Sequence, residues 1–82
     1  MRKLVLYSRP ECHLCEALEQ DLVPLLEGRA AVEKVDVDSS VMLERRYGHR
    51  IPVLVDGETE REISGYPLDP ASVLAYLERP ER

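Results

Sequence analysis

Two cysteines, Cys12 and Cys15, offer the most evident chemistry in this chain, and they are spaced as Cys-x-x-Cys. The thiolate form of cysteine is the one that attacks disulfides and binds metals. At this spacing in a helix the side chains lie one turn apart on one face, within reach of a disulfide. The sequence has no second cysteine pair and only two histidines, His13 and His49, and His13 lies between the cysteines, where it is poorly placed to complete a tetrahedral zinc site. The pair therefore predicts thiol–disulfide redox chemistry and no metal site.

We expect Cys12 to be the nucleophile, because it comes directly before a predicted helix. The positive end of a helix dipole and its free N–H groups typically lower a cysteine pKa from about 8.5 to about 3.5–7.5. Arg9 and a protonated His13 would also favour the thiolate, whereas the neighbouring acidic side chains would oppose it. Cys12 would attack a substrate disulfide, and Cys15, turned toward the interior, would resolve the mixed disulfide.

A strand and a helix must hold this pair, and the hydrophobic pattern predicts both. Residues 3–7 form a nearly continuous apolar run, which is typical of a strand buried on both faces. Apolar residues then recur every three or four positions over residues 14–26, although Pro24 should kink or restart this helix and Gly28 should end it. Residues 32–37 predict a half-exposed edge strand. The three elements make a right-handed βαβ unit with parallel strands.

The second half of the chain predicts a short helix, a hairpin and a last helix. Ser39 or Ser40 would cap the short helix, which would run through Tyr47 to a stop at Gly48. The hairpin would join strands over residues 51–55 and 60–63 through an Asp56-Gly57 turn. Asp69-Pro70 is a good N-cap and first residue for the last helix, whose predicted apolar face is Val73, Leu74 and Leu77. The predicted element order is β-α-β-α-β-β-α.

Length and charge exclude several classes of function. The 82 residues predict one domain over residues 1–82, and the net charge of −5 argues against a nucleic-acid partner. The apolar run near the N-terminus is too short for a signal peptide, and no stretch approaches the roughly 20 apolar residues of a membrane span. We therefore expect a cytoplasmic protein without a membrane partner, in a compartment where structural disulfides are rare. No large apolar stripe is evident, so we expect a monomer.

Three segments together resemble one family. They are Tyr7-Ser8-Arg9-Pro10-Glu11-Cys12-His13-Leu14-Cys15, Arg50-Ile51-Pro52-Val53 and Ser64-Gly65-Tyr66. The first is similar to the active-site segment of glutaredoxins, and the element order agrees over nearly the whole chain. The chain looks most like the short bacterial glutaredoxin-like proteins of the thioredoxin superfamily. This resemblance implies an α/β thioredoxin-like fold, in which helices flank both faces of a four-stranded mixed sheet of order 2-1-3-4.

The resemblance also implies a substrate-binding surface beside the dithiol. Pro52 resembles the cis-proline of the family, which packs against the dithiol and turns the backbone of Ile51 toward the substrate. Arg9 resembles a basic residue that meets a glutathione carboxylate, and its alternative is a solvated surface charge. The other predicted substrate-binding residues are His13, Leu14, Gly65 and Tyr66. Leu14 would lie either beside the substrate disulfide or in the core, and Tyr66 either in the groove or over the end of the last helix.

Two departures from the family pattern leave the electron donor open. His13-Leu14 stands where glutaredoxins usually have Pro-Tyr, and the usual Gly-Gly with an acidic pair is absent after the fourth strand. Ser64-Gly65-Tyr66 is similar instead to a segment of redoxins that serve ribonucleotide reductase and accept electrons from thioredoxin reductase. Glutathione as a co-substrate and a thioredoxin reductase-type flavoprotein are therefore both candidate donors. We expect no bound cofactor.

The sequence thus predicts a thiol–disulfide oxidoreductase that reduces or exchanges protein disulfides or glutathione mixed disulfides. The alternative is a non-catalytic module: a redox sensor, or an adaptor that carries an iron–sulfur cluster between two chains with glutathione as a ligand.

Overall fold

The computed structural model describes residues 2–80, in which helices cover both faces of a four-stranded sheet. The elements are β1 (Arg2–Ser8), α1 (His13–Leu26), β2 (Ala30–Asp36), a short 3-10 helix η1 (Val37–Ser39), α2 (Val41–Tyr47), β3 (Val53–Asp56), β4 (Glu62–Ser64) and α3 (Pro70–Glu78). The strand order is β2-β1-β3-β4; β1 pairs with β2 in parallel, and the other pairs are antiparallel. The predicted fold class and strand order are confirmed, and η1 is the one addition to the predicted elements.

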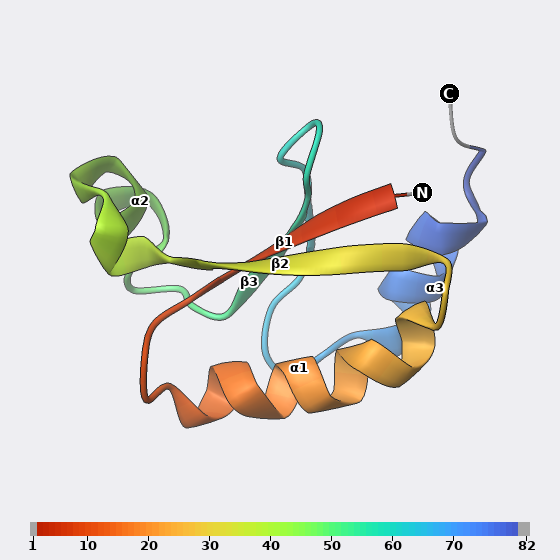
Figure 1. Cartoon of the computed structure of the whole chain (residues 1–82), viewed down its shortest axis with the longest axis horizontal. Coiled ribbons are helices and arrows are strands. Elements are labelled where there is room, and N and C mark those ends of the chain that lie inside the picture. The colour runs from red at the N-terminus through yellow and green to blue at the C-terminus, as the bar shows by residue number, and fades with distance from the viewer. Residues whose placement is uncertain (1, 81–82) are drawn as a thin grey trace.

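Alternation along β1 divides the core into two layers. Leu4 and Leu6 pack with the apolar residues of α1 and α3, whereas Val5 and Tyr7 pack with those around α2. Figure 1 shows the same division, with α1 and α3 on one side of the sheet and α2 on the other. The rings of Tyr7 and Tyr47 stack with their centroids 4.2 Å apart. Because both faces of β1 are covered, its sequence is a nearly unbroken apolar run.

Helix α1 runs without a restart through Pro24, so the predicted restart is absent, and the alternative of a kink at Pro24 stays a prediction. Pro24 lies on the exposed side of the last turn, where its missing N–H removes only one helical hydrogen bond near the end of the ladder. The side chains that α1 buries are Cys15, Leu18, Leu22 and Leu26. This stripe has the three- and four-residue spacing of an amphipathic helix. Gly28, with φ 75°, follows the C-cap and ends the helix as predicted.

The second strand begins and ends earlier than the sequence pattern indicates. It covers Ala30–Asp36, and Val37, predicted as its last residue, starts η1 and is fully buried. A side-chain oxygen of Asp36 accepts a hydrogen bond from the N–H of Asp38 at 2.8 Å. The hydroxyl of Ser39 donates to the carbonyl of Asp36 at 2.6 Å. These local bonds turn the chain out of the strand.

The loop between the two strands of the hairpin is longer than predicted. Strand β3 starts at Val53 because Pro52 has no N–H to give to a ladder, and β4 is shifted to Glu62–Ser64. The Asp56 carboxylate accepts a hydrogen bond from the N–H of Glu58 at 2.7 Å, and the Asp56 N–H donates to the carbonyl of Arg61 at 2.9 Å. The side chain of Asp56 thus orders the loop.

Both predicted N-caps in the second half are present, Ser40 on α2 and Asp69 on α3. The Ser40 hydroxyl accepts a hydrogen bond from the N–H of Leu43 at 3.4 Å, and Gly48 closes α2. In α3 the buried residues are Val73 and Tyr76, whereas Leu74 is 37% exposed. The prediction that Leu74 belongs to the apolar face is wrong, since Tyr76 takes that place. Within residues 2–80, no helix is long and apolar enough to cross a membrane.

Candidate functional site

The two cysteines lie at the start of α1 and are joined by a disulfide. Cys12 is the N-cap of the helix, and its Cα lies 5.3 Å from that of Cys15, within the usual range for a disulfide. Cys15 is 4% exposed and packs into the protein, whereas Cys12 is partly exposed. The prediction that Cys15 is the less accessible partner is confirmed.

The helix N-terminus supplies a donor to the outer sulfur. The N–H of Cys15 points at Sγ of Cys12, 3.2 Å away. Once the disulfide is reduced, the same N–H can stabilise a thiolate at Cys12, as can the positive end of the helix dipole. The arrangement thus gives the more exposed sulfur the environment that a nucleophile needs.

The strand register brings Pro52 to the same end of the sheet as the disulfide. Tyr7 of β1 lies opposite Val53 of β3, so the chain enters β3 beside the place where β1 leaves the sheet toward Cys12. The peptide bond between Ile51 and Pro52 is cis, and Pro52 is buried. Ile51 is half-buried and packs against the cluster around Tyr7 and Tyr47.

Gly65 and Tyr66 reach this end of the sheet from β4. A Cβ atom at Gly65 would lie 3.7 Å from the carbonyl oxygen of Pro52, so Gly65 adjoins the Ile51–Pro52 segment. Tyr66 is 48% exposed, and the bond that joins it to Pro67 is a second cis peptide, which the sequence analysis did not anticipate. Leu14 is 50% exposed and not part of the core. His13, at the start of α1, is also exposed.

Arg9 is bound by the protein itself. Its Nε donates to both carboxylate oxygens of Asp38, at 3.2 and 3.0 Å, and its Nη2 donates to one of them at 3.1 Å. Its Nη1 lies 3.5 Å from the carbonyl oxygen of Gly48. The hydrogen bond with Asp38 is the main reason that the pKa of Arg9 is raised above its ordinary value. This ion pair joins the loop before the disulfide to η1.

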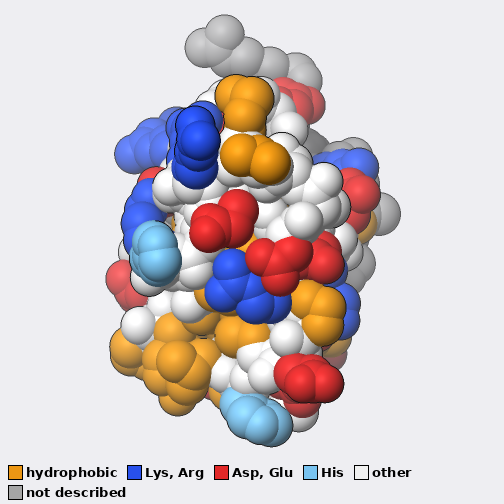
Figure 2. Space-filling model, turned by 90° about the vertical axis from the view of Figure 1, so that its left-hand side faces the viewer, with side chains coloured by type: hydrophobic (Ala, Val, Ile, Leu, Met, Phe, Trp, Pro, Cys, Tyr) orange, Lys and Arg blue, Asp and Glu red, His pale blue; other side chains and the backbone are white. Residues whose placement is uncertain are grey.

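A second ion pair, between Arg50 and Glu62, joins the segment before β3 to the first residue of β4. Its hydrogen bond lowers the pKa of Glu62 and raises that of Arg50. Figure 2, which faces the side of the molecule that carries α2 and the start of α1, shows basic and acidic side chains in contact at its centre and hydrophobic side chains below them. No motif or spacing in the sequence singles out Asp38 or Glu62.

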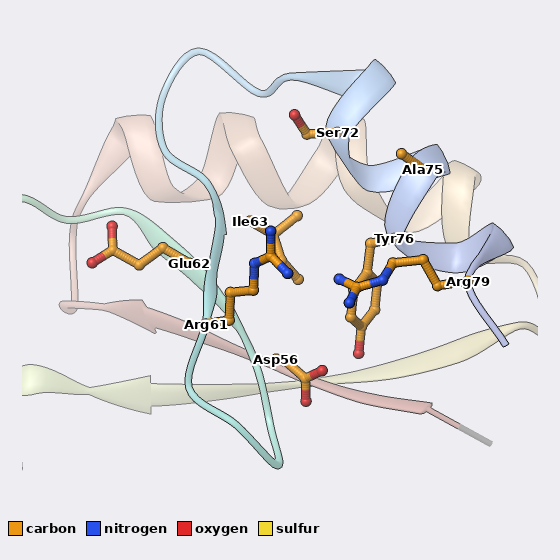
Figure 3. Close-up of a pocket in the computed structure, with 8 residues that line it drawn as sticks. All are labelled: Asp56, Arg61, Glu62, Ile63, Ser72, Ala75, Tyr76 and Arg79. Carbon is orange, nitrogen blue, oxygen red and sulfur yellow. The ribbon is translucent and has the colours of Figure 1, made fainter. Parts of the chain in front are cut away.

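A pocket of about 440 Å³ lies elsewhere, between the β3–β4 hairpin and α3. Figure 3 shows its lining, which includes Arg61, Tyr76 and Arg79 and none of the residues predicted for the site. Within residues 2–80, no three His, Cys, Asp or Glu side chains are arranged to hold a metal ion.

Comparisons with known proteins agree with this geometry. Residues 3–78 match the family model described as Glutaredoxin-like domain (DUF836). Protein Ne2328 from Nitrosomonas europaea is similar in solution structure, with a TM-score of 0.84 and 37% identity over 94% of this chain and 92% of that one. The X-ray structure of protein XcR50 from X. campestris has a TM-score of 0.65 and 36% identity, over 94% of this chain and 99% of that one.

This chain also resembles a thioredoxin, in fold alone. Thioredoxin 1 from Thermosipho africanus has a TM-score of 0.61 at 17% identity, over 93% of this chain and 94% of that one. A search of curated proteins found no match to the sequence. The family model covers nearly the whole chain, including the Cys12–Cys15 pair and the segments around Pro52 and Gly65, and so the chain belongs to the glutaredoxin-like family DUF836, with a thioredoxin-like fold.

Proposed function

We propose that this protein is a thiol–disulfide oxidoreductase that reduces or exchanges disulfides through Cys12 and Cys15. The observation that carries the proposal is the placement of the pair: a partly exposed sulfur at a helix N-cap and a buried partner one turn away. A disulfide that only staples the fold gains nothing from a donor N–H aimed at its outer sulfur. We expect the reaction in the cytoplasm, where thiols are kept reduced.

The catalytic cycle begins with the reduced protein. The Cys12 thiolate attacks one sulfur of the substrate disulfide; a bond forms between the two sulfurs, and the second substrate sulfur leaves as a thiolate that takes up a proton. Cys15 then loses its proton and attacks Sγ of Cys12, which forms the disulfide seen here and releases the remaining substrate thiol. Two electrons have passed to the substrate. Two molecules of glutathione, which leave as glutathione disulfide, or a thioredoxin reductase-type flavoprotein would return two electrons to the Cys12–Cys15 disulfide.

The surface around the disulfide supports a peptide-like substrate. Ile51 and Pro52 precede β3 without a strand partner of their own, so the backbone of Ile51 can pair with an extended substrate segment. Gly65 leaves room beside Pro52, and the exposed side chains of Leu14 and Tyr66 give apolar surface at the flanks. An apolar surface of this kind suits the residues that adjoin a disulfide in a protein.

Two serine variants test the proposal. In a single-turnover assay with a disulfide-bonded protein substrate, Cys12→Ser should show no exchange, because the nucleophile is gone. Cys15→Ser should accumulate a mixed disulfide between Cys12 and the substrate, since no resolving thiol is present. Mass spectrometry of the quenched reaction measures both outcomes. Exchange by Cys12→Ser at the wild-type rate would refute the role of Cys12, and failure of Cys15→Ser to trap a substrate would refute that of Cys15.

A further inference from the structure

Two arginines flank the segments that we expect to hold a substrate, and both face carboxylates of the same chain. Arg9 lies three residues before Cys12, and Arg50 directly precedes Ile51. The register of β1 and β3 places both segments at one end of the sheet. Their partners, Asp38 and Glu62, come from η1 and β4. The two arginines that flank these segments are therefore paired before any ligand arrives.

The pairing of Arg9 occupies the edge of the guanidinium that best recognises a carboxylate. Nε and Nη2 present two roughly parallel N–H groups, the arrangement that binds a carboxylate in bidentate fashion. Asp38 takes both, with donor–acceptor distances of 3.0 to 3.2 Å, while Nη1 is directed at the carbonyl of Gly48. A carboxylate of a substrate must displace Asp38 to obtain the same contacts.

The local charge then works against acidic substrates. With Arg9 neutralised by Asp38, the charged side chains next to the cysteines in the sequence are those of Glu11 and Glu16, both exposed. A substrate carboxylate held near Cys12 meets these like charges without a free cation at Arg9 to offset them. Neutral or basic segments around a substrate disulfide meet no such repulsion.

On this basis we propose that Asp38 sets the substrate class of the dithiol: it holds Arg9 away from ligands and so disfavours the carboxylate-bearing glutathione mixed disulfides relative to disulfides with uncharged surroundings. The inference rests on the proposed oxidoreductase function and names the substrates of that site. Asp38 acts through Arg9 and is a positioning residue, since it touches neither cysteine.

The test compares two mixed disulfides of one cysteine-containing peptide, one with glutathione and one with 2-mercaptoethanol. Reduced protein in excess reacts with each in a single turnover, so no electron donor is needed, and the measured quantity is the ratio of the two second-order rate constants. Asp38→Asn should raise the glutathione-to-mercaptoethanol ratio about two- to fivefold, the size of one exposed charge pair expressed as a rate ratio. High salt should shrink the gain because the groups are exposed.

Matched variants separate this effect from a change in net charge or structure. Glu33→Gln frees Lys3 from a more exposed ion pair, 2.8 Å long, between β1 and β2 and should leave the ratio unchanged. Asp38→Glu should keep the ratio low, and Arg9→Gln combined with Asp38→Asn should cancel the gain.

The outcomes distinguish this inference from the proposed function. An unchanged ratio in Asp38→Asn, or an equal rise in Glu33→Gln, overturns the role of Asp38 while the reaction with the mercaptoethanol disulfide still supports an oxidoreductase. No reaction of the wild-type protein with either disulfide overturns the proposed function, and the inference falls with it.

Discussion

Unequal access to the two sulfurs leads to a prediction about the reduced protein. Cys12 is partly exposed and receives the N–H of Cys15, whereas Cys15 is 4% exposed. Iodoacetamide reacts with exposed thiolates, so it should alkylate Cys12 well before Cys15. Tandem mass spectrometry of the digested protein at successive times measures which sulfur is modified. Equal rates at the two positions would contradict the division into nucleophile and resolving thiol.

Single residues also show where the sequence is an incomplete guide. The Cys-x-x-Cys spacing and the proline before the third strand are local features, and the sequence analysis identified them. The partner of Arg9 lies 29 residues away and that of Arg50 lies 12 residues away. Asp38 and Glu62 look like ordinary solvated charges in a linear sequence, because their pairing depends on which strand ends the fold brings together. Tertiary contacts of this kind leave no periodic pattern.

At the scale of elements, the N-cap of α3 gives a prediction about pH. The Asp69 carboxylate accepts hydrogen bonds from the hydroxyl of Ser72 at 2.7 Å and from its N–H at 3.3 Å, and these bonds lower the pKa of Asp69. A carboxyl whose pKa is lower in the folded state stabilises the fold above its unfolded pKa of about 3.9, and this contribution is lost as the pH falls below that value. The wild-type protein should therefore lose it on acidification.

Asparagine caps helices about as well as aspartate but does not titrate in this range. Between pH 7 and pH 3, the free energy of unfolding should fall further in the wild type than in Asp69→Asn. Urea denaturation of both proteins at a series of pH values measures the difference. The other carboxylates titrate alike in the two proteins and cancel. If the free energy of unfolding fell by the same amount in both proteins on acidification, Asp69 would not have the lowered pKa.

Element types were predictable, whereas several boundaries were not. The 3.6-residue period of α1 and the apolar run of β1 come from burial, and the sequence pattern reports burial directly. Val37 looked like a strand residue because it continues the alternation of apolar and charged residues that includes Val35. It is buried, but in η1, since Asp36 and Ser39 bond to the backbone and turn the chain there. Pro24 was expected to kink or restart α1, and it does not restart the helix, because a proline on the exposed side of the last turn removes only one helical hydrogen bond.

The whole molecule offers little surface for pairing with a second copy. β2, at one edge of the sheet, carries Glu33 and Lys34, which form ion pairs with Lys3 and Glu19. β4, at the other edge, has three residues and a register irregularity against β3. Charged side chains on an edge, short strands and bulges all oppose edge-to-edge association. The exposed large apolar residues within residues 2–80 are divided among three helices and the loop after β4; they are Leu14 and Val23 on α1, Val41 and Met42 on α2, Leu74 on α3, and Tyr66.

These features predict a colourless monomer, and the prediction separates the oxidoreductase from the iron–sulfur adaptor. Sedimentation equilibrium of the purified protein should give the mass of one chain, 9.4 kDa, without visible absorption. A cluster held between two chains would instead give a coloured dimer. If Cys12 binds the cluster, the coloured dimer should be lost in Cys12→Ser. A colourless dimer that persists in Cys12→Ser would mean that two chains associate through a sheet edge or through the apolar residues of α2. Either kind of dimer would contradict the monomer, and the coloured one would favour the adaptor over the enzyme.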